Sequence, residues 1–163
     1  LSIAYIIAIL EEHKHKILVT ADRVEFVRDL HNAVSDNSSR LFIGESDTVD
    51  RDNYLKDIIS GKANKVFAST GLFSEGISCN PLSALVHTGS TNNESLIYQL
   101  IGRIQRIVEG KPTPVVIDVC LAGAAGKKHA RERKALYLVK GWKVIELNGL
   151  EDLNKTLQNI GKL

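Results

Sequence analysis

The chain has 163 residues, of which 44% are hydrophobic and 25% are charged, and its formal net charge is +2. These values describe one ordinary globular domain, large enough to bury roughly two thirds of its unfolded surface. The two cysteines, Cys79 and Cys120, have no CxxC partner, which excludes a zinc site or disulfide framework of the usual spacing. We therefore expect a reduced, intracellular protein of the cytoplasm.

The charge is spread unevenly along the chain. Residues 103–143 carry ten lysines and arginines against three acids, whereas residues 1–102 carry nine against thirteen. A basic segment of this kind indicates an anionic partner, although a solvated helix face would have the same composition. Both interpretations stay open on composition alone.

The first ten residues, LSIAYIIAIL, are apolar. They are too few to span a bilayer, and they lack the basic segment and cleavage site of a signal peptide. No membrane association is therefore predicted. Because the chain begins at Leu1 and contains no methionine, we expect it to be a fragment of a longer protein.

Short apolar, β-branched runs alternate with amphipathic segments along the rest of the chain. Strands are predicted at residues 16–20, 40–44, 65–69, 84–88, 114–119 and 142–147. Helices are predicted at residues 22–34, 48–60, 93–107, 125–140 and 150–160, the first of them with Asp22 as its N-cap. Apolar strands that are each followed by a helix indicate a single α/β domain, with a mostly parallel sheet of about six strands and helices on both faces.

Ligands of such sheets bind beyond the carboxyl ends of the strands. This rule selects the loops that follow Thr20, Gly44, Ser69, Thr88 and Val119. A site is therefore expected at that edge of the sheet.

The loop after the third predicted strand is rich in glycine and serine, ASTGLFSEGISCNP. Backbone amides in such a turn suit phosphate oxygens. Gly71 and Gly76 have the spacing of the two P-loop glycines, but Ile77 and Ser78 stand where the P-loop has its lysine and hydroxyl residue. The segment is either a phosphate-binding turn of another kind or a plain loop.

The segment YQLIGRIQR, residues 98–106, places Gln99, Arg103 and Arg106 at spacings of four and three. On a continuous helix these side chains would share one face. The apolar stripe facing the core would then contain Leu96, Leu100, Ile101, Ile104 and Val108. No acid lies four residues from either arginine, and Glu109, three residues from Arg106, is the one candidate ion-pair partner in the sequence. The face is therefore either solvated or salt-bridged or, since the planar guanidinium suits phosphate oxygens, a phosphate-binding face.

Two further polar residues lie at predicted strand ends. Asp118 ends an apolar strand, as do acids that hold Mg²⁺ in nucleotide hydrolases, but Val119 stands in place of the usual second acid. No metal site is therefore predicted in this chain. If the chain were instead a small-molecule enzyme acting on a phosphorylated metabolite, Asp118 or His87 would have to be its general acid or base.

Together these segments resemble the second, C-terminal RecA-like lobe of superfamily 2 helicases. QLIGRIQR matches the family's motif VI, QxxGRxxR, at its four fixed positions. STGLFSEGISCNP is similar to motif V, and KILVTADRVEFVRDL is similar to motif IV. The three motifs occur in the family's order and cover nearly the whole chain. The motif sequences FSEGIS and IGRIQR are most similar to those of phage recombination and branch-migrating DNA helicases.

The resemblance implies a role for each matching residue. Arg106 would be the arginine finger that reaches the γ-phosphate of ATP, with Arg103 beside it and Gln99 positioning the phosphate or the attacking water. The residues that would face the nucleotide are Glu75, Gly76 and Gly102. Those that would lie along the nucleic-acid backbone are Thr20, Ala21, Asp22, Thr70 and Gly71.

The resemblance also implies what this chain lacks. The family's N-terminal RecA-like lobe carries the P-loop lysine and holds Mg²⁺, so ATP and Mg²⁺ would act in the longer protein and neither would bind this fragment. The expected partners are that lobe and nucleic acid, DNA in particular, and the protein is expected to be a monomer, in the host-cell cytoplasm if it is a phage protein. The alternative is a non-catalytic nucleic-acid-binding module on the same fold. In either case the basic helix at 125–140 would track phosphates or be merely solvated.

Overall fold

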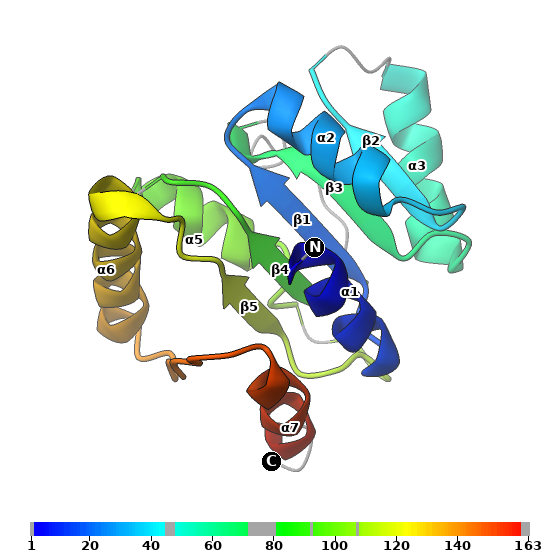
Figure 1. Ribbon diagram of the computed structural model, residues 1–163. Helices are drawn as coiled ribbons and strands as arrows, with labels where there is room; N and C mark the ends of the chain where they lie inside the picture. Colours follow the sequence, from blue (N-terminus) through cyan, green and yellow to red (C-terminus); the bar gives the residue numbers. More distant parts are fainter. Residues whose placement is uncertain (1, 45–47, 72–80, 92, 107, 161–163) are drawn as a thin grey trace.

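The computed structural model describes residues 2–44, 48–71, 81–91, 93–106 and 108–160. Its centre is a five-stranded sheet with the strand order β2-β3-β1-β4-β5, and all four pairings are parallel (Figure 1). The strands are β1 (Ile17–Ala21), β2 (Ser39–Phe42), β3 (Lys65–Ser69), β4 (Ala84–His87) and β5 (Val115–Asp118). The predicted parallel α/β architecture is confirmed.

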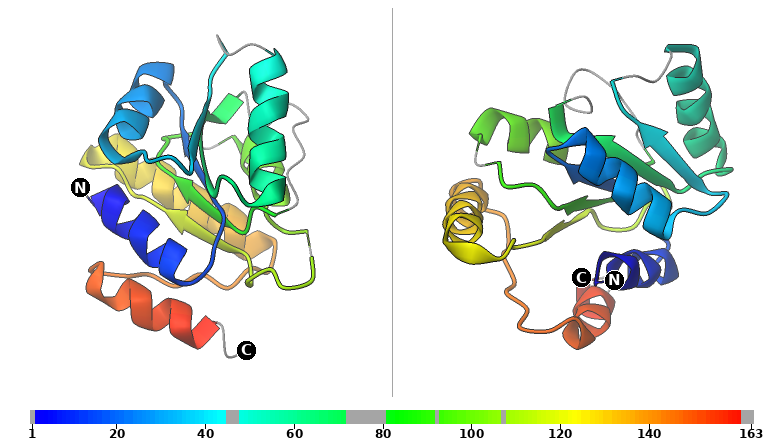
Figure 2. Two further views of the ribbon diagram at one scale, coloured as in Figure 1. Left: turned by 90° about the vertical axis from the view of Figure 1, so that its right-hand side faces the viewer. Right: turned by 45° about the horizontal axis from the view of Figure 1, so that its top comes forward.

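Helices cover both faces of the sheet, as Figure 2 shows for α2 and α3 on opposite sides. One layer contains α1 (Ser2–Glu12), α2 (Val24–Val34) and α7 (Glu151–Ile160). The other layer contains α3 (Thr48–Ser60), α5 (Glu94–Gly102) and α6 (Gly123–Val139). None of the described helices is long and apolar enough to cross a membrane.

The central strand β1 is buried on both faces because its side chains alternate between the two helical layers. Ile17 and Val19 belong to the core under α1, α2 and α7, whereas Leu18 belongs to the core under α3, α5 and α6. Each fully buried aliphatic side chain of this kind contributes roughly 1.5–3 kcal/mol. The apolar run ILVTA therefore specifies a strand with two buried faces.

The sequence prediction was wrong at two places near the chain ends. Residues 142–147 form no strand, because Trp142 packs against Tyr98 and Tyr137 of the helical layer while Ile145 and Leu147 stay exposed. The first apolar run forms α1, which was not predicted as a helix. Its length excluded a bilayer span, but its nearly unbroken apolar run has no helical period to recognise.

The predicted N-cap of the helix at 22–34 was also wrong. The helix α2 has Arg23 at its N-cap position, and no side chain there forms a capping hydrogen bond. The carboxylate of Asp22 instead bonds to two other loops. Asp22 therefore connects loops at the edge of the sheet and does not cap the helix.

Lys65, the first residue of β3, is a charged group in the interior, with only 1% of the residue exposed. Its Nζ donates to Glu11 Oε1 at 3.0 Å, to Asp36 Oδ2 at 2.9 Å and to Ser38 Oγ at 2.9 Å. Hydrogen bonds from Ser38 and then from Lys65 lower the pKa of Asp36 to about 2. The lysine thus ties α1 and the turn before β2 to the amino edge of the sheet.

We expect Lys65→Ala to lower the free energy of unfolding by about 2–4 kcal/mol, because it removes both a buried aliphatic stem and three charge-assisted bonds. Lys65→Met keeps the stem and should lose about 1–2 kcal/mol. The exposed Lys62→Ala is the control and should stay within about 0.5 kcal/mol. Urea denaturation measures all three, and equal stability of the two alanine variants would contradict the role of Lys65.

A buried histidine makes the stability depend on pH. His15 is 5% exposed, and its Nδ1 lies 2.8 Å from Ser83 Oγ. Burial first, and the neighbouring His13 second, lower the pKa of His15 from 6.5 to about 4. The folded chain therefore holds this ring neutral at pH values where the unfolded chain protonates it.

Acidification should destabilise the chain through His15. The cost is absent above pH 6.5, grows as the pH falls from 6.5 toward 4, and reaches about 3 kcal/mol at most. His15→Gln keeps a hydrogen-bonding group for Ser83 and should reduce the slope of the free energy of unfolding in this window. Asp36 acts at lower pH, and the lowered pKa values of His31 and His87 affect both proteins alike. Identical slopes for the wild type and His15→Gln would contradict the assignment.

Candidate functional site

The loops that follow β1, β3 and β4 meet at the carboxyl edge of the sheet, where Asp22 joins them. Thr70 Oγ1 donates to Asp22 Oδ1 at 3.1 Å. The Ser90 backbone N–H donates to Asp22 Oδ2 at 2.7 Å, and the Ser90 hydroxyl donates to the same oxygen at 3.2 Å. One carboxylate therefore connects three segments that are far apart in the sequence.

Gly89 is required where the loop after β4 passes this carboxylate. A Cβ at position 89 would overlap the Asp22 carboxylate and would lie 2.8 Å from His87 Cε1. Any side chain would have to displace Asp22 from its partners or push the buried His87 ring. The loop after β4 can approach Asp22 this closely only with glycine at this position.

A second set of hydrogen bonds joins the carboxyl ends of β1 and β4. Thr20 Oγ1 lies 3.0 Å from His87 Nδ1, and Thr88 Oγ1 donates to the Thr20 carbonyl oxygen at 2.8 Å. Burial lowers the pKa of His87, so this ring is neutral near pH 7. The side chains of Thr20 and Thr88 are committed to holding the two strands together.

The residues predicted to lie along a nucleic-acid backbone thus divide into two groups. The structure brings them all to the carboxyl edge of the sheet, but Thr20, Ala21 and Thr70 are buried, with at most 2% of each residue exposed. Asp22 and Gly71 are exposed. The predicted nucleotide-facing residues Glu75 and Gly76 lie outside the described residues.

Asp118, the acid at the end of β5, is held by two residues of α6. It accepts hydrogen bonds from Arg133 Nε at 2.8 Å, from Arg133 Nη2 at 2.7 Å and from the Tyr137 hydroxyl at 2.6 Å. Burial and the Asp118 charge raise the pKa of Tyr137 well above its usual value. With its oxygens engaged in this way, Asp118 is a structural ion-pair partner and not a general base.

The same arginine also connects α6 to the loop before α5. Arg133 is 1% exposed, and its Nη1 donates to the Thr91 carbonyl oxygen at 3.2 Å. With Asp118 engaged and His87 buried, neither acid–base candidate of the small-molecule-enzyme alternative faces a ligand. In the described part of the chain, no group of three His, Cys, Asp or Glu residues is placed to hold a metal ion.

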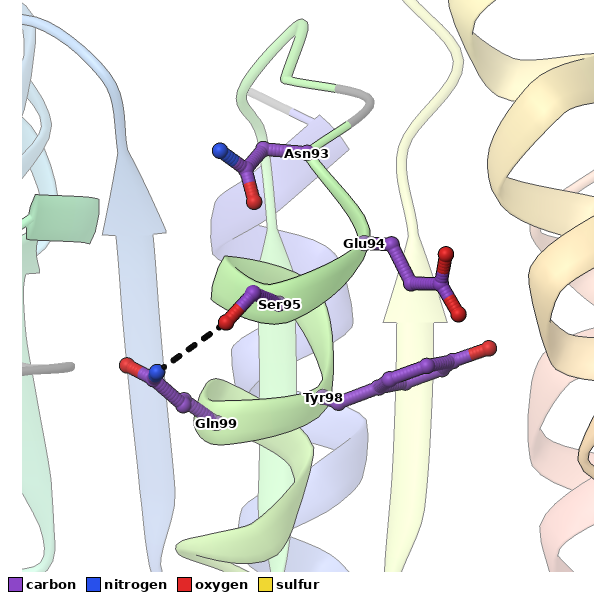
Figure 3. A pocket seen from close by; sticks show the side chains of 5 residues that line it. All are labelled: Asn93, Glu94, Ser95, Tyr98 and Gln99. Atoms are coloured by element: carbon purple, nitrogen blue, oxygen red, sulfur yellow. Dashed lines mark hydrogen bonds between the residues drawn. The ribbon is translucent and has the colours of Figure 1, made fainter.

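The helix α5 begins at a cap formed by Asn93, whose side chain accepts a hydrogen bond from the Leu96 backbone N–H at 3.1 Å. Its outer face lines an open hollow of about 610 Å³. Figure 3 shows Gln99 in this hollow beside Ser95, with Gln99 Nε2 donating to Ser95 Oγ at 3.2 Å. Tyr98 and Glu94 line the hollow on the other side of the same helix.

The prediction that Gln99, Arg103 and Arg106 share one helix face was wrong in its last member. The helix α5 ends at Gly102, Arg103 is its half-buried C-cap, and Arg106 lies beyond it, exposed and outside regular structure. Glycine weakens a helix at this position, and the chain tightens into i→i−3 bonds from Arg103 to Leu100 and from Ile104 to Ile101.

The predicted apolar stripe of this segment is only partly correct. Ile104 is fully buried and anchors the turn in the core, whereas Val108, also placed in the stripe, is 42% exposed. Ile97 is buried but had not been included. These differences follow from the end of the helix at Gly102, since residues beyond that point no longer keep a helical spacing.

Lys111 holds the segment after α5 and was not identified from the sequence. Its Nζ donates to the carbonyl oxygen of Ile104 at 2.8 Å and to that of Arg106 at 2.7 Å. These carbonyl groups would otherwise lack the partners that a continuing helix provides. No sequence pattern indicates such a bond, because the local sequence around a loop lysine does not reveal whether its side chain is solvated or bonded to the main chain.

The family model of the helicase conserved C-terminal domain matches residues 2–108. A protein of Escherichia phage T5, "Probable helicase D10", is 41% identical over 135 residues. That alignment covers 82% of this chain and 30% of the relative, so this chain spans less than a third of the relative's length.

Solved structures show the same fold at low sequence identity. Dbp5 of Saccharomyces cerevisiae, bound to RNA and ADP BeF3, matches with a TM-score of 0.76 at 12% identity, over 99% of this chain and 41% of Dbp5. The helicase MrfA, bound to DNA and AMPPNP, matches with a TM-score of 0.60 at 15% identity, over 83% of this chain and 20% of MrfA. The predicted resemblance to the C-terminal, RecA-like lobe of a helicase is confirmed, and the chain belongs to the helicase conserved C-terminal domain family.

Proposed function

We propose that this chain is the C-terminal motor lobe of an ATP-dependent superfamily 2 DNA helicase or translocase, and that Arg106 is its arginine finger. The observation that carries the proposal is the placement of Arg106. It is exposed at the end of α5, and no described acidic side chain forms an ion pair with it. Its main chain is nevertheless fixed, because Lys111 holds its carbonyl oxygen.

The surroundings of Arg106 suit an approaching phosphate group. A Cβ at Gly102 would have no heavy atom within 4 Å, so the helix end is open to a ligand or another lobe. Gln99 and the half-buried Arg103 lie on the same helix end, and we propose that they position the phosphate or the attacking water. ATP supplies the phosphoryl group whose charge an arginine stabilises during hydrolysis.

The remaining predicted site residues are proposed to lie on the nucleic-acid side of the lobe. They share the carboxyl edge of the sheet, where Gly71 is exposed and a Cβ at its position would meet no heavy atom within 4 Å. Backbone groups at such a turn contact phosphates without reading sequence. The DNA and RNA in the MrfA and Dbp5 structures support nucleic acid as the partner class.

The complete protein is proposed to contain the N-terminal RecA-like lobe that binds ATP and Mg²⁺. In this scheme the present chain binds neither alone, and the protein acts as a monomer in the host-cell cytoplasm, with recombination as its setting. The phage T5 relative supports the phage origin of this family branch.

A second function is favoured by one observation, the basic outer face of α6. Lys127, Lys128 and Arg131 are exposed there, and the only described ion pair among them joins Lys128 to Glu132 at 4.0 Å. A lobe that has lost ATP coupling would use such a face as a non-catalytic nucleic-acid-binding module. Its binding should weaken steeply as the salt concentration rises, and it should not require Arg106.

We expect Arg106→Ala to lower the kcat of DNA-stimulated ATP hydrolysis by the complete protein about 10³-fold or more, with ATP and DNA affinities retained. Arg106→Lys keeps the charge but loses the guanidinium fork, and it should recover little of the rate. Steady-state hydrolysis assays and equilibrium binding measure these effects. If Arg106→Ala hydrolyses ATP with the kcat of the wild type and binds DNA in a salt-dependent way, the non-catalytic module is favoured instead.

Lys111→Met should lower the same kcat by about tenfold, because the finger would lose the bonds that fix its main chain. The concentrations of ATP and of DNA that give the half-maximal rate should change little. Lys155→Met replaces an exposed lysine of α7 and is the matched control. If both methionine variants have the same kcat, Lys111 has no part in placing Arg106.

A further inference from the structure

Asp22 is the exposed side chain among the residues predicted to meet the nucleic-acid backbone, yet its chemistry does not suit a phosphate. A carboxylate and a phosphate repel each other. Both Asp22 oxygens, moreover, already accept hydrogen bonds from Thr70 and Ser90. A direct contact with the backbone would bring two anions together and compete with these bonds.

The partners of Asp22 belong to the two halves of the proposed site. Thr70 directly follows β3, at the start of the segment proposed to meet nucleic acid. Ser90 lies three residues before Asn93, the cap of the helix that carries Gln99 and ends at the proposed arginine pair. Thr70 is therefore connected to the residues before α5 through a single carboxylate, that of Asp22.

The short loop between Ser90 and α5 is itself held at a second point. The Thr91 carbonyl oxygen accepts a hydrogen bond from the buried Arg133, whose other nitrogens bind Asp118. Ser90 and Thr91, which precede α5 in the chain, are thus held from two sides, by Asp22 and by Arg133.

We infer that Asp22 is a positioning residue that couples the nucleic-acid side of this lobe to the helix end bearing Arg103 and Arg106. The inference rests on the proposed function. Asp22 acts by holding Thr70 and Ser90 at a fixed separation, so that a displacement of the Thr70 segment by nucleic acid is transmitted to α5. It does not bind the nucleic acid itself.

Substitutions at and around Asp22 separate the effect of its hydrogen bonds from the effect of its charge. In Asp22→Asn the amide oxygen accepts from the Ser90 N–H, and the amide nitrogen donates to Thr70 Oγ1, so both contacts survive without the charge. Asp22→Ala removes both. Gly89→Ala keeps the carboxylate in the chain but displaces it from its hydrogen-bond partners. Ser90→Ala loses only the longer of the two Ser90 bonds and is the matched control.

The test measures ATP hydrolysis by the complete protein as a function of single- and double-stranded DNA concentration. For Asp22→Ala we expect about a tenfold lower kcat at saturating DNA, with the DNA concentration at half-maximal rate changed by less than about twofold. Gly89→Ala should behave in the same way. Asp22→Asn and Ser90→Ala should keep at least about half of the wild-type kcat, and thermal melting confirms that each variant is folded.

Three results would overturn this role of Asp22. The first is an unchanged kcat in Asp22→Ala. The second is a raised half-maximal DNA concentration with unchanged kcat, which would make Asp22 a DNA contact. The third is an Asp22→Asn variant no better than Asp22→Ala. A wild-type protein without DNA-stimulated hydrolysis would instead overturn the proposed function, and this role with it.

Discussion

The central strand β1 is paired in parallel on both sides and buried on both faces, and this constraint brings Thr20, Asp22 and Thr70 to one edge of the sheet. A buried strand must find partners for its backbone groups; β3 provides them along the whole of β1, and β4 provides them from Ile17 to Thr20. Because the pairing is parallel, the carboxyl ends of all three strands lie at one edge. Segments that are 48 and 68 residues apart in the sequence consequently meet at Asp22.

Two carboxylates organise this edge, and each is used to hold segments together. Asp22 joins the loops after β1, β3 and β4, and Asp118 joins β5 to α6 through Arg133 and Tyr137. At the C-terminal end of α5, the described residues Gln99 and Arg106 are exposed, whereas the exposed acid Glu94 lies in the first turn of the same helix. This division suits a lobe that contributes positive charge to a reaction whose other groups lie elsewhere.

The inner strands β1, β3 and β4 were predictable because each is a largely apolar run whose residues are all buried, and that pattern is local. The position of Gln99 was predictable for the same reason, since it lies within a periodic helix, and Arg103 directly follows that helix as its C-cap. Arg106 was misplaced because the end of a helix depends on Gly102, on the burial of Ile104 and on the distant donor Lys111. Asp22 followed by Glu25 has the pattern of a helix cap, but its true partners are distant in sequence. The WKVIEL segment alternates as a strand does, and only the packing of Trp142 on two tyrosines decides otherwise.

The proposed function requires the end of α5 to present Arg106 to a nucleotide held by another lobe. The most direct measurement is a structure of the complete protein with DNA and a non-hydrolysable ATP analogue. We expect the Arg106 nitrogens at hydrogen-bonding distance, about 3 Å, from the terminal phosphate, with Lys111 still bonded to the Arg106 carbonyl oxygen. A closed complex in which Arg106 points into solvent or contacts only DNA would contradict it.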